Sequence, residues 1–334
     1  MKKTYYLFNP GRLSRKDNTL KFTPVDEEGT ELMPKYIPIE SVSDLYVFGS
    51  LDANSSMYNF LGKRQVNVHF FDYYEHYTGS FYAKEYLLAG KLQVSQSQHY
   101  LSAKKRMVLA RSFVAGASSN MLRILKYYQN RGKELGEIID KVEYLQGEIQ
   151  SAMAVDELMG IEGNIRQVYY DGFDVVLSDL KMEGRSKQPP KNEVNSLISF
   201  GNMLCYTICL DQVYHTQLNP TISFLHEPGT RRFSLALDLA EVFKPLLVDR
   251  TVFSVLNKQQ LTAHDFHDST GRITLKEAGK KKFLRSWEER LGQTIKHRSL
   301  GRHVSYKHLI KLECYKLCNH LIGTQEYQPF KAWW

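Results

Sequence analysis

Two carboxylates on one apolar helix are the residues best suited to metal chemistry. Residues 233–245 read FSLALDLAEVFKP, and the predicted helix is apolar on all sides except at Asp238 and Glu241, which stand at i and i+3. Buried carboxylates need a cation, because an unpaired buried charge is costly. Carboxylate oxygens suit Mg²⁺ and Mn²⁺, so the pair predicts a metal site. We expect Pro245 to end this helix. The alternative is ordinary ion pairing with nearby arginines, Arg231, Arg232 or Arg250.

A histidine precedes this acidic helix. His226 ends an apolar run and is followed by Glu-Pro-Gly, so its imidazole is expected at the mouth of a loop. An isolated histidine is more often a satisfied structural group than a ligand. The position of His226 just before two acids favours a role as a ligand.

A third candidate, Glu162, lies between Gly160 and Gly163 within a helical pattern. Each interior glycine costs about 1 kcal/mol relative to alanine, which indicates that backbone, a ligand or a partner approaches there. The alternative is an exposed Glu162–Arg166 pair at i and i+4, which contributes only about 0.3–0.5 kcal/mol. That pair would not explain the two glycines.

The four cysteines form two C-x-x-x-C pairs, Cys205/Cys209 and Cys314/Cys318. On helices, each pair shares one face. One four-thiolate metal site is the alternative, but structural zinc usually uses tighter C-x-x-C spacing. The apolar neighbours favour buried free thiols.

Two regions of different character must position these residues. Residues 1–85 contain short aromatic and β-branched runs separated by turn signals; the predicted strands are 4–8, 20–22, 36–39, 45–48 and 66–70, with one short helix at 54–63. From residue 86 onward the spacing is helical; the predicted helices are 102–128, 135–155, 157–178, 194–215, 235–243, 276–291 and 303–321. The sequence therefore predicts an α+β protein with a small, mostly antiparallel β domain (1–85) and a larger all-α domain (86–334).

Composition, charge and missing motifs exclude several classes of protein. The 334 residues are 43% hydrophobic and 24% charged, which is typical of a globular chain. The longest apolar stretch, 197–210, is too short to cross a bilayer, and no secretory leader is evident. We expect a soluble cytoplasmic protein. Residues 1–85 carry 10 basic and 11 acidic residues, a net charge of −1, whereas the whole chain carries +8. The residues after 85 therefore carry +9, and such a positive field is suited to binding a polyanion. No phosphate-binding glycine loop, dinucleotide fingerprint or serine-hydrolase elbow occurs.

In their order and spacing, these elements resemble the CRISPR-associated integrase family, Cas family one, the universal endonuclease of spacer acquisition. The matching stretches are 158–164 (LMGIEGN), 189–201 (PPKNEVNSLISFG), 224–229 (FLHEPG), 234–241 (SLALDLAE) and 245–250 (PLLVDR). The likeness extends to residues 36–39 (YIPI) and to the closing 329–334 (PFKAWW), which look like subtype I-B. It covers essentially the whole chain.

The resemblance implies a dimerising β domain and a catalytic, DNA-binding helical domain. It places the metal ligands on Glu162, His226 and Glu241, with Asp238 and Asn164 as catalytic neighbours. Many relatives carry Asp at the position of Glu241, and Glu reaches one methylene further. The mixed ligand set suits Mg²⁺ or Mn²⁺ and leans toward Mn²⁺. Candidate contacts to DNA phosphates are the basic residues Arg166, Arg185, Lys187, Arg231, Arg232 and Lys244.

The implied reaction is the insertion of short foreign DNA fragments (spacers) into the CRISPR array, by attack of a 3′-hydroxyl on a phosphodiester. This transesterification needs no protein nucleophile, which agrees with the missing serine and cysteine motifs. The implied partners are double-stranded DNA, a second copy of the chain, and the small second universal adaptation subunit in a heterohexamer, in a prokaryotic cytoplasm and without a membrane. The alternatives are a general metal-dependent nucleic-acid phosphoesterase and a non-catalytic DNA scaffold.

Overall fold

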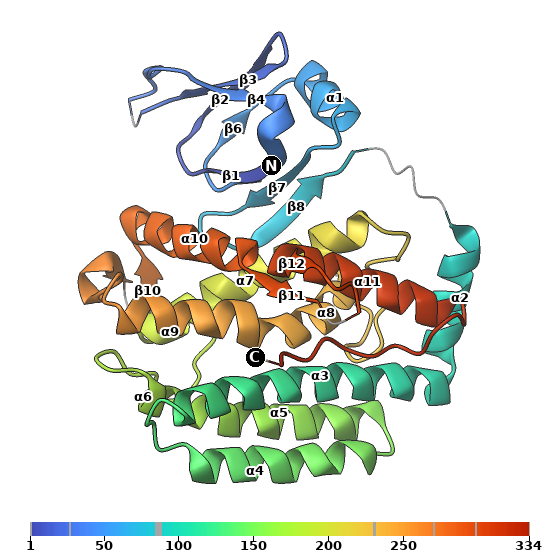
Figure 1. The fold of residues 1–334 in the computed structure, drawn as a ribbon. Coiled ribbons are helices and arrows are strands. Elements are labelled where there is room, and N and C mark those ends of the chain that lie inside the picture. The colour runs from blue at the N-terminus through green and yellow to red at the C-terminus, as the bar shows by residue number, and fades with distance from the viewer. Residues whose placement is uncertain are drawn as a thin grey trace. The chain divides into compact units, whose positions relative to one another are not determined.

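The computed structural model describes residues 2–26, 28–83, 89–229, 232–269, 271–297 and 299–333, and the side chain of residue 269 is not included. The chain divides into two compact units, residues 1–88 and 89–334 (Figure 1). A β-rich N-terminal region precedes a helical one, so the predicted α+β class is confirmed. None of the described helices is long and apolar enough to cross a membrane.

Among its described residues, the N-terminal unit contains two four-stranded sheets and one α-helix, α1 (Ser55–Lys63), which the Asn54 side chain caps. The first sheet has the order β1 (Lys3–Leu7), β5 (Val42–Val47), β7 (Asn67–Phe71), β8 (Tyr77–Phe81). The second has the order β4 (Lys35–Pro38), β3 (Thr19–Pro24), β2 (Gly11–Lys16), β6 (Leu51–Asp52). Apolar side chains such as Leu20, Leu45 and Leu61 form their core.

The strand pairing of this unit is mixed, whereas the sequence predicted mostly antiparallel pairs. The β1/β5, β5/β7 and β2/β6 pairs are parallel, and the other three pairs are antiparallel. Parallel neighbours need a crossover connection, and α1 lies in the connection from β5 to β7. The helix predicted at 54–63 therefore already indicated that the strands on either side of it, β5 and β7, could pair in parallel.

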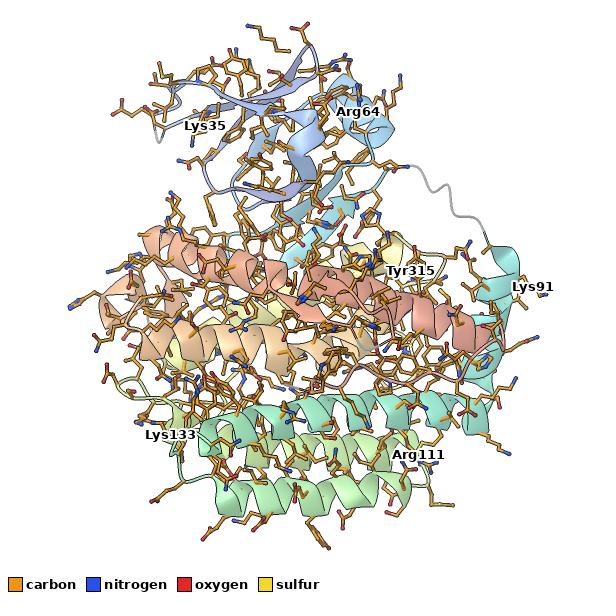
Figure 2. The ribbon with its side chains drawn as sticks, in the orientation of Figure 1. Lys35, Arg64, Lys91, Arg111, Lys133 and Tyr315 are labelled. Carbon is orange, nitrogen blue, oxygen red and sulfur yellow. The ribbon has the colours of Figure 1, made fainter. Side chains whose placement is uncertain are left out.

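The second unit is mainly helical, and side chains fill the space between its helices (Figure 2). Its helices are α2 (Gly90–Leu101), α3 (Ala103–Gln129), α4 (Gly136–Gly147), α5 (Val155–Asp171), α6 (Phe173–Val176), α7 (Glu193–Tyr214), α8 (Ser234–Lys244), α9 (Arg250–Asn257), α10 (Glu277–Gly292) and α11 (Tyr306–Leu321). Two small antiparallel hairpins, β9 (Phe266–Ser269) with β10 (Arg272–Leu275) and β11 (Thr294–Lys296) with β12 (His303–Ser305), show that it is not all-α as predicted.

The helix that carries the candidate acids is central in this unit. Helix α8 packs against α3 and α7, and every residue from Ser234 to Phe243 except Leu237 is buried. Pro245 does not end the helical path as predicted. Its missing N–H is tolerated at the start of a new segment, and residues 245–249 continue with π-helical hydrogen bonding directly into α9.

One buried amide ties α8 to the C-terminal segment. Asn120 of α3 is fully buried, and its Nδ2 donates to the carbonyls of Val242 at 2.8 Å and Phe330 at 3.0 Å. Its Oδ1 accepts from the Ala332 amide at 2.8 Å. The Asn120 side chain therefore links α3 to α8 and to the C-terminal segment.

Asn120→Ala is expected to lower the free energy of unfolding by about 2–4 kcal/mol, because it leaves buried donors and acceptors without partners. Chemical denaturation of both proteins measures this loss. Asn130→Ala, which truncates an exposed amide just beyond the same helix, is the matched control. A loss below about 0.5 kcal/mol for Asn120→Ala would contradict this role.

Candidate active site

Asp238 and His226 form one hydrogen-bonded unit. The Asp238 carboxylate is 0% exposed and accepts the backbone amides of Phe224 and Leu225, at 2.7 and 3.0 Å, on Oδ2. Its Oδ1 accepts the His226 amide at 3.0 Å and lies 2.8 Å from His226 Nδ1. Asp238 therefore fixes both the loop before α8 and the ring of His226.

This bond determines which nitrogen of His226 is available as a ligand. A carboxylate can only accept, so His226 Nδ1 donates a hydrogen bond to Asp238. Nε2 is then the ring nitrogen left to act as a ligand, and it has no hydrogen-bond partner among the described residues. A carboxylate behind a histidine ring is the arrangement that orients metal-binding histidines.

Glu241, one turn further along α8, faces a different set of groups. Its Oε2 pairs with Arg166 of α5, and its Oε1 lies 2.6 Å from Lys244 Nζ. Burial raises the pKa of Glu241, but the positive charges of Arg166 and Lys244 outweigh this and lower it to about 2. His226 also contributes to the lowering of the Glu241 pKa.

Arg166 joins the two candidate acidic ligands. Its Nε donates to Glu162 Oε1 at 2.8 Å, and its Nη2 contacts both Glu162 and Glu241. Burial lowers the pKa of Arg166, yet Glu241 and Glu162 raise it well above its usual value. The predicted i, i+4 pair therefore exists, but it belongs to a larger, partly buried cluster of two acids and two bases.

The ion pairs proposed from the sequence for α8 are wrong for the described residues. Neither Asp238 nor Glu241 pairs with Arg232 or Arg250: the partners are backbone amides, His226, Arg166 and Lys244. Arg231 lies outside the described residues. The i, i+3 spacing suggested one shared cation, whereas the two carboxylates have separate roles.

The glycines beside Glu162 are open on the side where a side chain would project. A Cβ built on Gly160 or Gly163 meets no atom within 4 Å other than those of adjacent residues and of the nearby backbone of α5. No neighbouring backbone of this chain therefore requires them. Asn164 is exposed on α5, and no described contact joins it to the cluster, as expected for residues two apart on a helix.

A buried pair behind the cluster was not predicted from the sequence. Tyr169 of α5 donates its hydroxyl to Asp249 Oδ2 at 3.0 Å, and both side chains are buried. Burial raises the pKa of Asp249 to about 7 against the opposing charge of Arg166. The only available signal was an acid within the apolar run 245–249.

The six candidate DNA contacts fall into three groups. Lys187 and Arg232 are exposed. Arg166 and Lys244 are held by the acids described above, and Arg185 donates to Asn195 Oδ1 at 2.8 Å and to Ser199 Oγ at 3.2 Å. Arg231 lies outside the described residues.

The cysteines behave as expected from their apolar neighbours. All four are free and buried, and burial raises the pKa of the Cys209 and Cys314 thiols well above the usual value. Within the described residues they form no group that could hold a metal ion.

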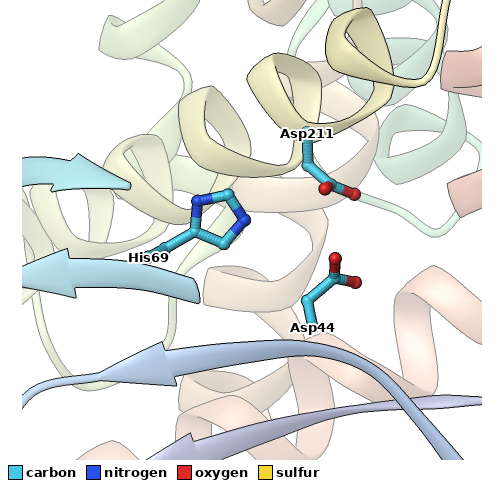
Figure 3. Close-up of side chains that lie close together, drawn as sticks. All are labelled: Asp44, His69 and Asp211. Carbon is cyan, nitrogen blue, oxygen red and sulfur yellow. The ribbon is translucent and has the colours of Figure 1, made fainter. Parts of the chain in front are cut away.

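Another acid–histidine pair lies in the N-terminal unit, with Asp44 on β5 and His69 on β7 (Figure 3). His69 Nδ1 is 2.7 Å from Ser80 Oγ of β8. Asp211, drawn in the same figure, belongs to α7 of the other unit. The positions of the two units relative to one another are not determined, so we assign no site to these three residues.

The fold and the cluster define a two-unit α+β protein whose helical unit holds a histidine and acids suited to a divalent ion. Comparison with known proteins gives the family. Residues 5–289 match the model of the family CRISPR associated protein Cas1. The chain belongs to this family, as the sequence resemblance indicated.

Curated relatives match the full chain. CRISPR-associated endonuclease Cas1 of Fusobacterium nucleatum is 46% identical, with 100% of this chain and 98% of that protein covered. CRISPR-associated endonuclease Cas1 2 of Thermodesulfovibrio yellowstonii is also 46% identical, with both chains covered completely. The expectation of a CRISPR-associated endonuclease is confirmed by these relatives, whereas subtype I-B stays a prediction.

Solved structures support the fold. The Cas1 protein of Thermotoga maritima is 41% identical, covers 97% of this chain and 99% of its own, and superposes with a TM-score of 0.84. A casposase bound to integration product is 18% identical, covers 99% of this chain and 93% of its own, and has a TM-score of 0.88. The second likeness shows that the same fold occurs at low sequence identity.

Proposed function

We propose that this chain is a divalent-metal-dependent DNA endonuclease and integrase of CRISPR adaptation, which inserts short foreign DNA fragments into a repeat array. The observation that carries the proposal is the cluster formed by α5, α8 and the loop before α8. It combines an oriented histidine with two carboxylates, Glu162 and Glu241. The names of the full-length relatives support the same activity.

The donor set fits a divalent ion. Glu162 and Glu241 offer oxygens, and His226 offers Nε2; such a mixed set suits Mn²⁺ and also accepts Mg²⁺. The ligand atoms of these three residues do not all lie within 4.8 Å of one another, and Arg166 Nη2 already occupies one oxygen of each carboxylate. Arg166 must therefore withdraw from at least one carboxylate for all three residues to bind the same ion.

A bound ion would help to deprotonate the attacking 3′-hydroxyl and would stabilise charge on the phosphate. In the reaction, one P–O bond forms to the incoming 3′-oxygen, and one breaks to the 3′-oxygen of the cut strand, which ends as a hydroxyl. The residues of the chain orient the site: Asp238 holds His226, and α5 presents Glu162. We propose that Arg166, once released, contacts the phosphate.

The proposed assembly with DNA and other subunits is the one that the family resemblance implies. The N-terminal unit is proposed to dimerise the chain, and the helical unit to bind double-stranded DNA through its basic excess. Solved structures titled as complexes of Cas6-RT-Cas1 with Cas2 share the fold. We propose that this chain also assembles with the small second adaptation subunit, as a heterohexamer in the cytoplasm. DNA affinity based on phosphate contacts should fall steeply with salt.

Competition between Arg166 and the ion leads to a prediction. Arg166→Gln removes the guanidinium from the Glu162 and Glu241 oxygens, so Mn²⁺ is expected to bind about tenfold more tightly, a change of about 1.4 kcal/mol. Isothermal titration of the DNA-free protein with Mn²⁺ measures this. Lys187→Gln removes the same charge from an exposed position and should leave the affinity unchanged. Unchanged or weaker Mn²⁺ binding in Arg166→Gln would show that Arg166 does not compete.

Strand joining distinguishes the proposed integrase from the two alternatives. With the small partner, a duplex with free 3′-hydroxyls and a plasmid bearing a repeat array, the proposal predicts metal-dependent joined product. Cutting without joining would indicate a general phosphoesterase. DNA binding without either activity would indicate a scaffold.

A further inference from the structure

A cavity of about 520 Å³ lies at the C-terminal end of α3, where that end meets α9 and α10. Its volume is within the usual range for small-molecule sites, roughly 300–1,000 Å³. None of the candidate metal ligands Glu162, His226 and Glu241 lines it. Arg250, which lines the cavity, directly follows Asp249, whose carboxylate bonds to Tyr169 behind the metal cluster. The cavity is therefore a separate feature on the same helical path.

The lining carries a strong positive charge. Four basic residues, namely Arg131, Arg250, Lys258 and Arg290, face one acid, Glu289, which leaves a net charge of +3 (four minus one). Such a concentration of cations within one cavity attracts an anionic ligand.

Arg290 offers a hydrogen-bond donor to such a ligand. Its Nη1 donates to Gln293 at 2.7 Å, but its Nε is buried and has no hydrogen-bond partner among the described residues. A buried donor without a partner is unfavourable. Burial and the nearby charge of Arg250 lower the pKa of Arg290, and an anion in the cavity would relieve both effects.

An aromatic ring lies among these cations. The Cζ atoms of Arg131 and Arg250 lie 4.5 and 4.4 Å from the ring centroid of Tyr127. The neighbouring Tyr128 packs edge-on against Phe253, with centroids 5.3 Å apart. Aromatic rings and guanidinium planes are the surfaces on which nucleobases stack, and arginines also bind phosphate.

We propose that this cavity binds one nucleotide unit, with its phosphate on Arg250 and Arg290 and its base against Tyr127 and the Arg131 guanidinium. The amides of Gln260 and Gln293 line the same cavity and supply hydrogen bonds to a base edge. A free mononucleotide and a nucleotide within a single strand present the same chemistry. The proposal does not depend on metal binding or on strand joining.

Calorimetric titration of the full chain in chelator tests the cavity without the metal site. The probes are deoxyadenosine monophosphate, inorganic phosphate and a short 5′-phosphorylated single strand. The variants are Arg131→Gln, at an exposed side chain that can be changed without disturbing the core, and Arg290→Gln. Arg285→Gln removes an exposed charge of α10 that does not line the cavity, so it is the matched control.

We expect the mononucleotide to bind more tightly than inorganic phosphate, and each cavity variant to weaken binding about tenfold while Arg285→Gln does not. Tighter binding of the strand than of the mononucleotide would identify DNA as the source of the nucleotide, and equal binding would identify a free nucleotide. The proposal is overturned if the mononucleotide does not bind, if inorganic phosphate binds equally well, or if Arg285→Gln weakens binding as much as the cavity variants.

Discussion

Glu162→Ala is expected to reduce metal-dependent strand joining about a thousandfold or more while leaving DNA binding nearly intact. The substitution removes one of the proposed metal ligands, and a bound ion contributes several kcal/mol to stabilising the transition state. Arg166 keeps its contact with Glu241 after the change, so we expect the fold to persist. Joining is measured on a plasmid target, and binding by titration with a labelled duplex.

A control on the same helix separates loss of a ligand from loss of charge. Asp156→Ala removes an exposed acid from the first turn of α5 and should leave both joining and binding unchanged. If Glu162→Ala weakened DNA binding as much as joining, its role would lie in binding, and the assignment of Glu162 as a catalytic ligand would be wrong.

Asp238→Ala is expected to lower the free energy of unfolding by about 3–5 kcal/mol. It leaves three backbone amides, those of residues 224–226, without their acceptor, and each buried unsatisfied donor costs about 1–3 kcal/mol. Denaturant unfolding measures the loss. Asp140→Ala, at an exposed position on α4, should change stability by less than about 0.5 kcal/mol.

Asp238→Asn tests the second role of this carboxylate. The amide keeps one acceptor oxygen, which can still accept from the Phe224 and Leu225 amides, but its NH₂ group replaces the oxygen that accepts from His226. Loss of such a carboxylate partner typically costs 10–100-fold in metal affinity, so we expect Mn²⁺ binding to weaken by about that factor. Mn²⁺ affinity equal to that of the unchanged protein would show that Asp238 only organises the loop.

Most of the large elements were predictable from sequence periodicity. The predicted helices at 102–128, 194–215 and 235–243 match α3, α7 and α8 to within one residue at each end, because long apolar patterns with clear ends define them. Helix α9 was not predicted, because Pro245 was expected to end the helical segment that precedes it. The π-helical segment that carries the chain past this proline has no distinct sequence pattern.

The candidate site was predictable in its residues but not in its pairing. The order of Glu162, His226 and Glu241 along the chain, together with a family resemblance, selected them from the sequence. Sequence spacing suggested that Asp238 and Glu241 share one cation, since they are one turn apart. In the structure Asp238 accepts from the His226 loop and Glu241 contacts Arg166 of α5. Such tertiary contacts leave no local signal.

The role of Arg166 illustrates the same limit. A lysine or arginine four residues after a glutamate predicts only a local pair, and a basic residue beside a candidate site suggested a DNA contact. The bridge from Arg166 to Glu241 joins residues 75 positions apart, and it makes Arg166 part of the site itself.

The most direct test of the central claim is a strand-transfer assay with the chain, its small partner, a short duplex with free 3′-hydroxyls and a supercoiled plasmid bearing a repeat array. Reactions with Mn²⁺, Mg²⁺ and chelator are compared. We expect joined product with either ion and none in chelator. Joined product in chelator, or cutting without joining in the presence of either ion, would contradict a metal-dependent integrase built on Glu162, His226 and Glu241.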